Sequence, residues 1–456
     1  KPCVAMMGLA FKPNIDDLRE SPAKYITTKV MQSCNNANIL VVEPNVKEHH
    51  VFKLTDYKEA YDKADIVVFL TAHTPFKELD WTFVEYLKNS EYMNILELTG
   101  MKSTKYGGVE SYFAELVKIC RVDKFIFVYE SMPISEKYVN DINKWGGVIL
   151  CKQSISTFQY FKFVIGVIKR EKIDIVHFHF GSYLIAPFLR ILFPRIRIIS
   201  TRHSEIFVSN KLKKLYLKFC FFPFERFLCV SCGVKKEMIE GVGFSSKSEV
   251  LYLGVRKKKI VNPNLKKTLD IPKGVVVLTT IGFNIRIKGF DILVKSIQSL
   301  MDSNRLKNDI IVLVIGISEN SEDSNSLRQL IAEAGLNRKI MSLGIRNDIN
   351  DILNISDIYL QPSRTEGLSL SIMEALNYSL PVIGTRVGGI PEIVHEGENG
   401  YLFEKENVEE LADRIEILVN NREVREMMGR KSKVISSRFT LADGVEKLAS
   451  IYHQTN

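Results

Sequence analysis

Short apolar runs alternate along this chain with longer stretches in which apolar residues recur at helical spacing. The runs have the length of buried strands, and the stretches between them have the length of helices. This alternation predicts parallel sheets covered by helices, an α/β fold in which ligands collect at the carboxyl ends of strands. The strands are predicted near residues 94–98, 125–129, 173–178, 196–201 and 227–231, then near 275–281, 310–315, 358–361 and 380–384, with a last helix over 441–453.

The stretch 366–374, EGLSLSIME, holds two carboxylates eight positions apart where a loop is predicted to meet a helix. Ser363 and Thr365 are the predicted helix caps. Free amides at a helix start, here those of Gly367 and Leu368, attract phosphate. Two acids beside an anion site suit a nucleotide sugar, with one acid on ribose hydroxyls, one on sugar hydroxyls, and the diphosphate on the amides. By spacing alone, two surface glutamates flanking a helix start explain the pattern equally well.

The longer run 361–394, QPSRTEGLSLSIMEALNYSLPVIGTRVGGIPEIV, closely resembles the retaining glycosyltransferases of family 4. Three further segments resemble that family in the same order, so the resemblance covers about residues 93–456. It implies a GT-B fold of two facing Rossmann-like domains and a hexosyltransferase that moves a sugar from a nucleoside diphosphate to a hydroxyl with retention at the anomeric carbon. The three segments are 107–111 (GGVES), 174–179 (DIVHFH) and 281–291 (IGFNIRIKGFD).

The resemblance also indicates site residues. Lys288 matches the family's phosphate-binding lysine; without the resemblance it is a solvated loop lysine. Phe283 stands where the family usually has an arginine, so Arg286 is the expected substitute. His203 matches a histidine beside the donor sugar, where it orients a hydroxyl or relays a proton; taken alone, it is more often a structural polar residue. The expected catalytic set is Glu366, Glu374, Lys288 and His203, and the expected donor-binding set is Gly107, Gly108, Arg286, Gly367, Leu368 and Ser369.

Residues 93–456 offer few further candidates for a functional role. Gly107 and Gly108 lack a Cβ, which lets the first loop approach the diphosphate closely. His177 and His179 alternate along a predicted strand, so we expect only one of them to face the site. Neither pairs with acids at metal-ligand spacing, and no nucleophile is evident. We therefore expect no metal and no other cofactor, with the nucleotide sugar acting as substrate.

Residues 1–90 carry a second resemblance. The segments GLAFKPNIDDLRESP (8–22), LVVEP (40–44) and DIVVFLTAH (65–73) resemble the C-terminal UDP-binding domain of the UDP-glucose/GDP-mannose dehydrogenase family, closest to UDP-N-acetylmannosaminuronate dehydrogenases. It implies a small Rossmann-like domain in which Lys12 and Arg19 contact a UDP-sugar; an ion network of Asp16, Asp17 and Arg19 that fixes the loop is the alternative. Lys1 begins within a predicted strand, so we expect a longer natural protein. No glycine-rich nicotinamide-binding fingerprint occurs in residues 1–92, which leaves oxidation unsupported.

The net charge also differs between residues 1–92 and the rest of the chain. Residues 1–92 hold 11 Lys and Arg against 13 Asp and Glu, so the excess of +9 for the whole chain lies in the remainder. Much of it lies between residues 152 and 259, interleaved with aromatic residues, as in KLKKLYLKFCFF (211–222). Such a face predicts peripheral contact with anionic lipid, although a buried amphipathic helix with solvated lysines has the same pattern. No nucleic-acid-binding module is recognised. Seven scattered cysteines and no signal peptide favour a cytoplasmic protein, peripheral on the inner face of the membrane.

The expected organisation is a dehydrogenase-type domain (1–92), an acceptor domain (93–258), a nucleotide-sugar donor domain (259–440) and a terminal helix that crosses back to the acceptor domain (441–456). The favoured function is a bacterial glycosyltransferase for capsule, O-antigen or another surface polysaccharide. It is expected to use a UDP-sugar, with a GDP-sugar as the alternative, and a lipid-linked glycan acceptor. The alternatives are a truncated bifunctional dehydrogenase and glycosyltransferase fusion, and a non-catalytic protein that binds nucleotide sugars. Fold alone does not distinguish them.

Overall fold

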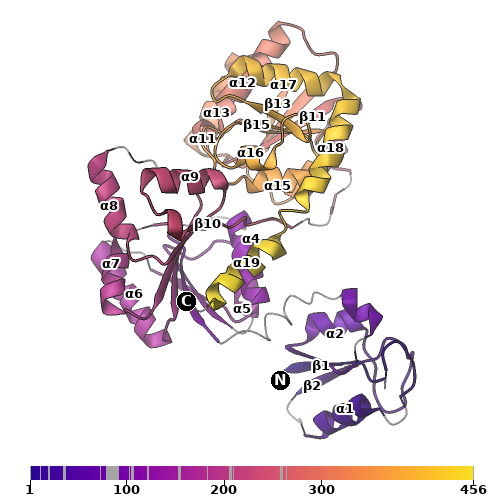
Figure 1. Cartoon of the computed structure of the whole chain (residues 1–456). Coiled ribbons are helices and arrows are strands. Elements are labelled where there is room, and N and C mark those ends of the chain that lie inside the picture. The colour runs from indigo at the N-terminus through magenta and orange to yellow at the C-terminus, as the bar shows by residue number, and fades with distance from the viewer. Residues whose placement is uncertain are drawn as a thin grey trace. The chain divides into compact units, whose positions relative to one another are not determined.

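The computed structural model describes residues 2–10, 12–18, 21–33, 37–71, 73–78, 92–101, 103, 107–120, 123–152, 156–181, 183–204, 208, 210–256, 260–262 and 264–454. The chain divides into two compact units, residues 1–89 and residues 90–456. Each unit is an α/β structure with parallel sheets, as the alternation of apolar runs predicts (Figure 1).

The first unit is a small Rossmann-like domain. Its three parallel strands, in the order β2-β1-β3, pack against helices through a core that includes Met7, Ala60 and Phe76. Glu43, which follows β2, is buried and accepts hydrogen bonds from the backbone amides of Leu9 at 2.7 Å and Ala10 at 2.9 Å, so it fixes the loop after β1. The elements are β1 Cys3–Met7, α1 Pro22–Ser33, β2 Asn38–Val42, α2 Tyr57–Lys63, β3 Ile66–Phe69 and the 3-10 turn Thr74–Glu78.

The second unit begins with a lobe built on a seven-stranded parallel sheet in the order β10-β9-β8-β7-β4-β5-β6, which we call the first lobe. All five strands expected here are present, because their apolar runs are almost fully buried. The strands are β4 Asn94–Leu98, β5 Lys124–Tyr129, β6 Val148–Cys151, β7 Ile175–Phe178, β8 Arg197–Arg202, β9 Arg226–Cys229 and β10 Ser248–Val250. The helices are α4 Gly108–Ile119, α5 Glu136–Lys144, α6 Thr157–Glu171, α7 Ala186–Leu192, α8 Lys211–Phe221 and α9 Cys232–Gly241.

The second lobe has a six-stranded parallel sheet in the order β13-β12-β11-β14-β15-β16. Its core lies between this sheet and α12, α13 and α17, with Leu293, Val312 and Ile415 fully buried. The strands are β11 Val276–Ile281, β12 Ile310–Ile315, β13 Ile340–Ser342, β14 Ile358–Gln361, β15 Val382–Thr385 and β16 Gly400–Phe403. The helices are α10 Leu265–Thr268, α11 Ile285–Lys288, α12 Phe290–Asp302, α13 Glu322–Glu333, α14 Ile349–Ile355, α15 Leu370–Asn377, α16 Ile390–Ile393, α17 Val408–Asn420 and α18 Arg422–Ser436.

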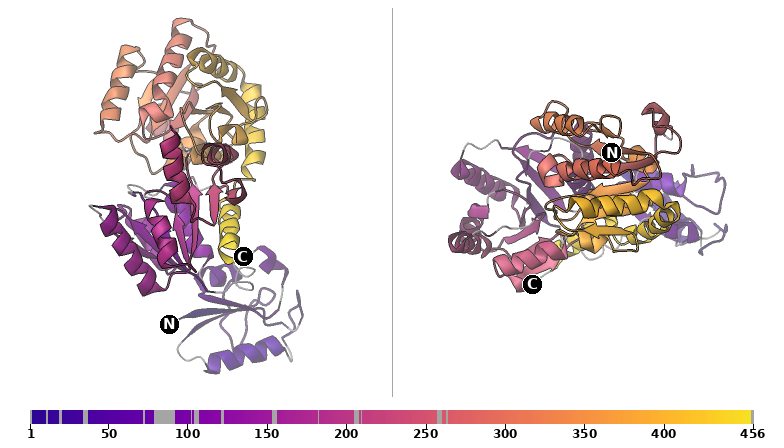
Figure 2. Two further views of the ribbon diagram at one scale, coloured as in Figure 1. Left: turned by 60° about the vertical axis from the view of Figure 1, so that its left-hand side comes forward. Right: turned by 90° about the horizontal axis from the view of Figure 1, so that it is seen from above.

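The last helix, α19 (Leu441–His453), follows the second lobe in sequence but packs on the first (Figures 1 and 2). Tyr112 of α4 donates a hydrogen bond from its hydroxyl to the carbonyl oxygen of Gly444 at 3.2 Å. Arg197 of β8 donates to the carbonyl oxygens of Ile451 at 3.1 Å and Tyr452 at 2.5 Å. Tyr452 is thereby carried into the core of the first lobe, where it is fully buried.

Two local predictions need correction. The helix start near residue 370 is capped by Ser369, whose hydroxyl accepts from the amide of Ile372 at 3.4 Å, and not by Ser363 or Thr365. Both of those residues lie in the preceding loop, too far upstream to reach the first turn. Four strands, β6, β10, β13 and β16, were also missed. Within the described part of the chain, no helix is long and apolar enough to cross a bilayer.

Candidate active site

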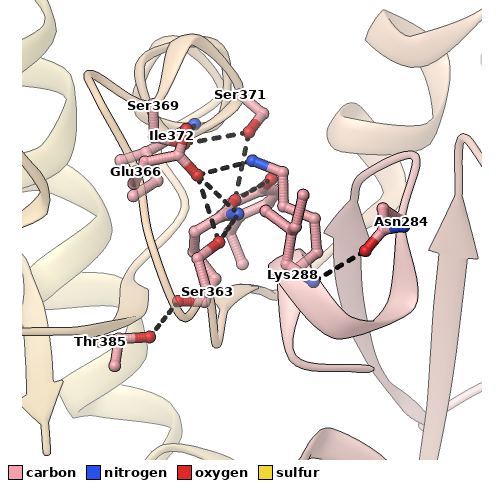
Figure 3. A network of polar contacts seen from close by, with 11 residues as sticks. Asn284, Lys288, Ser363, Glu366, Ser369, Ser371, Ile372 and Thr385 are labelled. Atoms are coloured by element: carbon pink, nitrogen blue, oxygen red, sulfur yellow. Dashed lines mark hydrogen bonds and ion pairs between the residues drawn. The ribbon is translucent and has the colours of Figure 1, made fainter. Parts of the chain in front are cut away.

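The first predicted carboxylate, Glu366, lies at the centre of a polar network at the carboxyl end of β14 (Figure 3). Lys288 donates from Nζ to Oε2 of Glu366 at 2.6 Å, and the hydroxyl of Ser363 donates to the same oxygen at 3.2 Å. Nε2 of Gln361 donates to the Ser363 hydroxyl at 2.7 Å. The side chains of Lys288 and Glu366 are each 12% exposed, so the ion pair is largely shielded from water. A shielded pair beside a strand end is positioned for an anionic ligand.

The turn that presents Lys288 is fixed by backbone geometry. Asn284 caps the short helix α11 by accepting from the amide of Ile287 at 2.8 Å. Gly289 then adopts a left-handed φ of 66°, and a Cβ there would lie 1.8 Å from the carbonyl oxygen of Pro362. Only glycine permits this approach, which brings the Lys288 turn against the loop that carries Glu366.

Arg364 locks the same loop to the Lys288 turn. Its guanidinium makes a bidentate pair with Asp291, with both contacts at 2.7 Å, and donates to the carbonyl oxygen of Arg286, also at 2.7 Å. The pairing with Asp291 and Glu406 holds the pKa of Arg364 above its usual range. Because a bidentate pair fixes orientation as well as distance, Glu366 and Lys288 are preorganised without a ligand.

A row of amides follows Glu366. Among the described residues, none accepts a hydrogen bond from the backbone amides of residues 367–371, at the start of α15. The hydroxyls of Ser369 and Ser371 lie 3.1 Å apart, and Ser371 donates to Oε1 of Gln361 at 3.2 Å. Leu368 is buried. Unpartnered amides at a helix N-terminus attract phosphate oxygens, so this row can hold a diphosphate.

The second predicted carboxylate, Glu374, lies in the second turn of α15 and is half-buried. Burial raises the pKa of Tyr359, and the negative charges of Glu366 and Glu374 raise it further. Both carboxylates therefore lie within electrostatic range of the same tyrosine near the end of β14.

The first lobe meets this region through glycines. A Cβ on Gly367 would lie 2.0 Å from the carbonyl oxygen of His203, and a Cβ on Gly108 would lie 2.3 Å from Cδ1 of Leu370. Gly107 caps α4, and its amide donates to Glu110 at 3.1 Å. His203, Gly108, Gly367 and the start of α15 thus line one seam between the two lobes.

A carboxylate from the second lobe also clamps this seam. Glu392 of α16 accepts from the amides of Cys232 and Gly233 at the start of α9, each at 2.9 Å. The hydroxyl of Tyr252 donates to the same carboxylate at 2.8 Å. Sequence reasoning missed Glu392, because its partners lie about 140 and 160 residues away in the chain.

Behind His203 lies a buried polar cluster that was not expected. Nε2 of His179 lies 2.7 Å from Glu97, and Nδ1 of His177 lies 3.2 Å from the same carboxylate. Both histidines therefore lie on the same side of the sheet, as strand residues two apart do. Of the two, His179 is the one whose ring contacts His203. The ligand atoms of this trio lie within 4.8 Å of one another, a spacing suited to a metal ion. Each ring nitrogen already has a hydrogen-bond partner, namely Glu97, His203, Tyr452 or Thr201. The hydrogen bonds therefore account for the cluster.

The other predicted residues are placed as follows. The side chain of Arg286 is exposed, and no described residue pairs with its guanidinium; Phe283 is 62% exposed beside it. Lys12 is exposed on the first unit, and Arg19 lies outside the described residues. Thus Glu366, Lys288, Gly367, Leu368, Ser369, Gly107, Gly108 and His203 gather at the seam with Glu374 close behind, whereas Arg286 is left outside the network.

Three family models match successive parts of the chain. Residues 106–259 match the model for glycosyltransferase family 4, residues 261–434 the model for glycosyl transferases group 1, and residues 5–94 the UDP binding domain of the UDP-glucose/GDP-mannose dehydrogenase family.

Individual relatives extend over both lobes. An uncharacterized glycosyltransferase of Methanocaldococcus jannaschii is 27% identical over 373 residues, covering 76% of this chain and 95% of its own. The Escherichia coli UDP-Gal:alpha-D-GlcNAc-diphosphoundecaprenol alpha-1,3-galactosyltransferase is 25% identical over 356 residues, covering 74% and 90%. The crystal structure of Anabaena Alr3699/HepE in complex with UDP-glucose superposes with a TM-score of 0.65 at 17% identity, covering 79% and 99%. The chain therefore belongs to the GT-B glycosyltransferases of family 4, is a hexosyltransferase, and carries in addition a UDP-binding domain of the UDP-glucose/GDP-mannose dehydrogenase family.

Proposed function

We propose that the two lobes transfer a sugar, with retention, from a UDP-sugar to a hydroxyl of a lipid-linked glycan during synthesis of a surface polysaccharide such as a capsule or O-antigen. The observation that carries the proposal is the ion pair of Lys288 and Glu366 beside the unpartnered amides of residues 367–371. A cation and a row of amides fit a diphosphate, and carboxylates next to them fit the hydroxyls of the ribose and the sugar.

The proposed role of Lys288 is to stabilise the departing diphosphate. Negative charge grows on the leaving phosphate as the sugar becomes oxocarbenium-like, so a fixed cation lowers the barrier more than it stabilises the bound donor. In the structure the cation is neutralised by Glu366 at 2.6 Å. When a donor enters, its phosphate competes for Lys288, and Glu366 is then available to accept hydrogen bonds from donor hydroxyls. Glu374 and the seam residue His203 bind further donor hydroxyls.

Two relatives support the choice of substrates. The name of the Escherichia coli relative states a UDP-sugar donor and an acceptor linked to diphosphoundecaprenol, and the Anabaena structure holds UDP-glucose. The test offers a panel of UDP- and GDP-sugars together with a short polyprenyl diphosphate-linked sugar, and determines the anomeric configuration of the product by NMR. Transfer from a UDP-sugar with retention is expected. Inversion at the anomeric carbon, or transfer from GDP-sugars alone, would refute the proposal as stated.

A lipid-linked acceptor requires access to a membrane surface, and α7 and α8 of the first lobe supply one. The two helices contact each other (Figure 1). Large apolar side chains are exposed on them and at the end of α8, including Ile191 (75%), Leu212 (80%), Leu215 (67%) and Phe222 (72%). Lys211, Lys213, Lys214 and Lys218 lie on the same helix α8, which has no acidic residue. We infer peripheral docking of this α7–α8 face on anionic lipid, with about 1 kcal/mol for each lysine near the surface.

Vesicle sedimentation tests the α7–α8 face. The chain should sediment with phosphatidylglycerol vesicles and remain in solution with phosphatidylcholine vesicles, and the double variant Leu212→Ser, Leu215→Ser should lose the binding. The control is Val434→Ser, which removes an equally exposed apolar side chain (64%) from α18 of the second lobe. Equal binding of the double variant and the control would contradict docking through this face.

The first unit gives a second candidate activity, because its match is to a UDP binding domain. We propose that it binds the UDP part of a nucleotide sugar, with the exposed Lys12 contacting phosphate. Calorimetric titration of UDP into Lys288→Met, which weakens the site at the seam, should show one remaining site, and adding Lys12→Ala should abolish it. If the wild type binds UDP at a single site and Lys288→Met no longer binds UDP, binding by the first unit is refuted.

A further inference from the structure

A chain of three side chains leads from the core of the first lobe to the seam. Oε2 of Glu97 lies 2.7 Å from Nε2 of His179, and Nδ1 of His179 lies 3.0 Å from Nε2 of His203. Glu97 and His179 are buried, whereas His203 is partly exposed and its carbonyl oxygen touches Gly367 across the seam. A buried carboxylate is therefore connected to a seam histidine through a second histidine.

The hydrogen-bond partners of Glu97 order the protons around it. The Tyr452 hydroxyl donates to Oε1 of Glu97 at 2.7 Å, so its oxygen accepts from Nδ1 of His177 at 2.6 Å. Nε2 of His177 lies 2.9 Å from the hydroxyl oxygen of Thr201. A carboxylate only accepts, so Nε2 of His179 carries a proton toward Glu97.

The direction of the hydrogen bond between His179 and His203 follows if both rings are neutral. Burial lowers the pKa of His179 to about 4, and burial together with nearby histidine charge holds the pKa of His203 well below its usual range. Each ring therefore carries one proton at pH 7. Since the proton of His179 is on Nε2, its Nδ1 accepts, and Nε2 of His203 must donate. Nδ1 of His203 is left with a lone pair.

That lone pair is available to a ligand. Among the described residues, none hydrogen-bonds to Nδ1 of His203, and the atom is absent from the fully buried unpaired polar atoms. The atom is therefore not fully buried, and the backbone of the same residue borders the seam. The ring is held in place by stacking on Phe180, with centroids 4.5 Å apart and planes at 19°.

We propose that Glu97 and His179 are positioning residues that fix His203 with Nε2 protonated, so that its Nδ1 accepts a hydrogen bond from a sugar hydroxyl at the seam. This inference rests on the proposed function for the identity of the ligand, but the tautomer itself does not. The carboxylate of Glu97 acts on His203 through the ring of His179. It thereby selects one tautomer of His203, with Nδ1 as the acceptor, where either tautomer would otherwise be possible. His203 thereby favours a ligand group that donates a hydrogen bond, such as a hydroxyl, over groups that only accept one.

NMR of the full chain labelled with ¹⁵N-histidine tests the tautomer without any turnover. The chain has eight histidines, and His203→Gln assigns the signal by its loss. His203 should show a protonated Nε2 and an unprotonated Nδ1 at pH 7.5. A protonated Nδ1 would overturn the proposal, whether or not the protein transfers sugar.

Variants test the role of Glu97. In Glu97→Gln a neutral amide faces His179 with either its oxygen or its nitrogen, so a second, Nδ1-protonated form of His203 should appear. The sugar-transfer kcat/KM should fall about tenfold, the worth of one hydrogen bond. Tyr452→Phe removes another partner of Glu97 but keeps the carboxylate, so His203 should retain its tautomer. If Glu97→Gln does not fold, His179→Gln interrupts the same chain with the same expectation. A single Nε2-protonated form in the folded variant would overturn the proposal, whereas absent transfer in the wild type would refute only the proposed function.

Discussion

Nζ of Lys288 lies 2.6 Å from Oε2 of Glu366, although the two residues are 78 positions apart and come from different strand ends of the second lobe. The glycine turn at Gly289 and the bidentate pair of Arg364 with Asp291 hold them there. Lys288 is thus neutralised by Glu366, and in the proposed mechanism an anionic donor competes for it. Several consequences of this arrangement can be measured.

Lys288→Met should lower kcat by about 10²- to 10³-fold, because a preorganised charge at the departing phosphate is lost. Steady-state kinetics of sugar transfer gives the value, and thermal unfolding should show a folded protein. Lys295→Met, which removes an exposed lysine of α12, is the matched control and should leave kcat unchanged. A kcat for Lys288→Met within a few-fold of the control would exclude the proposed role.

Glu374→Ala should raise the donor KM and lower transfer while the protein stays folded, since the proposed role of this half-buried carboxylate is to accept hydrogen bonds from donor hydroxyls. The loss of hydrogen bonds to a charged group corresponds to about 1.5–3 kcal/mol, or roughly 10- to 150-fold in kcat/KM. Glu423→Ala, at an exposed position of α18, provides the comparison. Unchanged turnover would count against Glu374 as a donor ligand.

Gly367→Ala should impair activity through the seam. The added Cβ would lie 2.0 Å from the carbonyl oxygen of His203, so either the lobes separate or the loop after Glu366 shifts. A displacement of about 1 Å at reacting groups costs on the order of 10²-fold in rate. Gly166→Ala in α6, where a Cβ meets nothing within 4 Å, should keep full activity and gain up to about 1 kcal/mol of stability. Equal activity in the two variants would show that the seam is not tight in solution.

Acid should destabilise the first lobe through its buried cluster. Burial lowers the pKa of His179 in the fold to about 4, below the usual 6.5, so the unfolded chain takes up a proton first as the pH falls. Stability is therefore lost between pH 6.5 and 4. Burial alone would raise the pKa of Glu97, but His177 and His179 outweigh it and hold this pKa below the usual range, which adds a loss of the same sign at lower pH.

Scanning calorimetry at pH 7.5, 6 and 5 measures this effect. The unfolding temperature should fall steadily over the series, and His179→Gln should flatten the dependence, whereas His395→Gln, a variant of a histidine in the second lobe, should not. A wild-type unfolding temperature that is constant from pH 6.5 to 5 would contradict the burial of a neutral His179.

Much of the fold was predictable because its central strands are buried on both faces. The strands near 94–98 and 310–315 and the helix over 441–453 match β4, β12 and α19 in both ends. The four missed strands lie at the edges of the two sheets, where β6, β10 and β13 are short and partly exposed and their apolar runs are weak. Local pattern carries little information at such positions.

The residues of the site also differ in how far the sequence could predict them. The stretch from Glu366 to Ser369 is contiguous, so its place between a strand and a helix could be predicted from the sequence. Glu97 could not be found that way, because it is one acid within an apolar strand and its partners His179 and Tyr452 lie 82 and 355 residues away. The cap at Ser369 was missed because several serines compete for that place.

Nucleotide release tests the central claim most directly. UDP- and GDP-sugars are offered to the full chain and to Lys288→Met, with and without a membrane extract rich in lipid-linked acceptors. We predict that one UDP-sugar gives nucleotide release that depends on the extract and is lost in Lys288→Met. Three results would contradict a glycosyltransferase site built on Lys288 and Glu366. They are release that needs no acceptor, release that persists in Lys288→Met, and the absence of release from every donor in the panel.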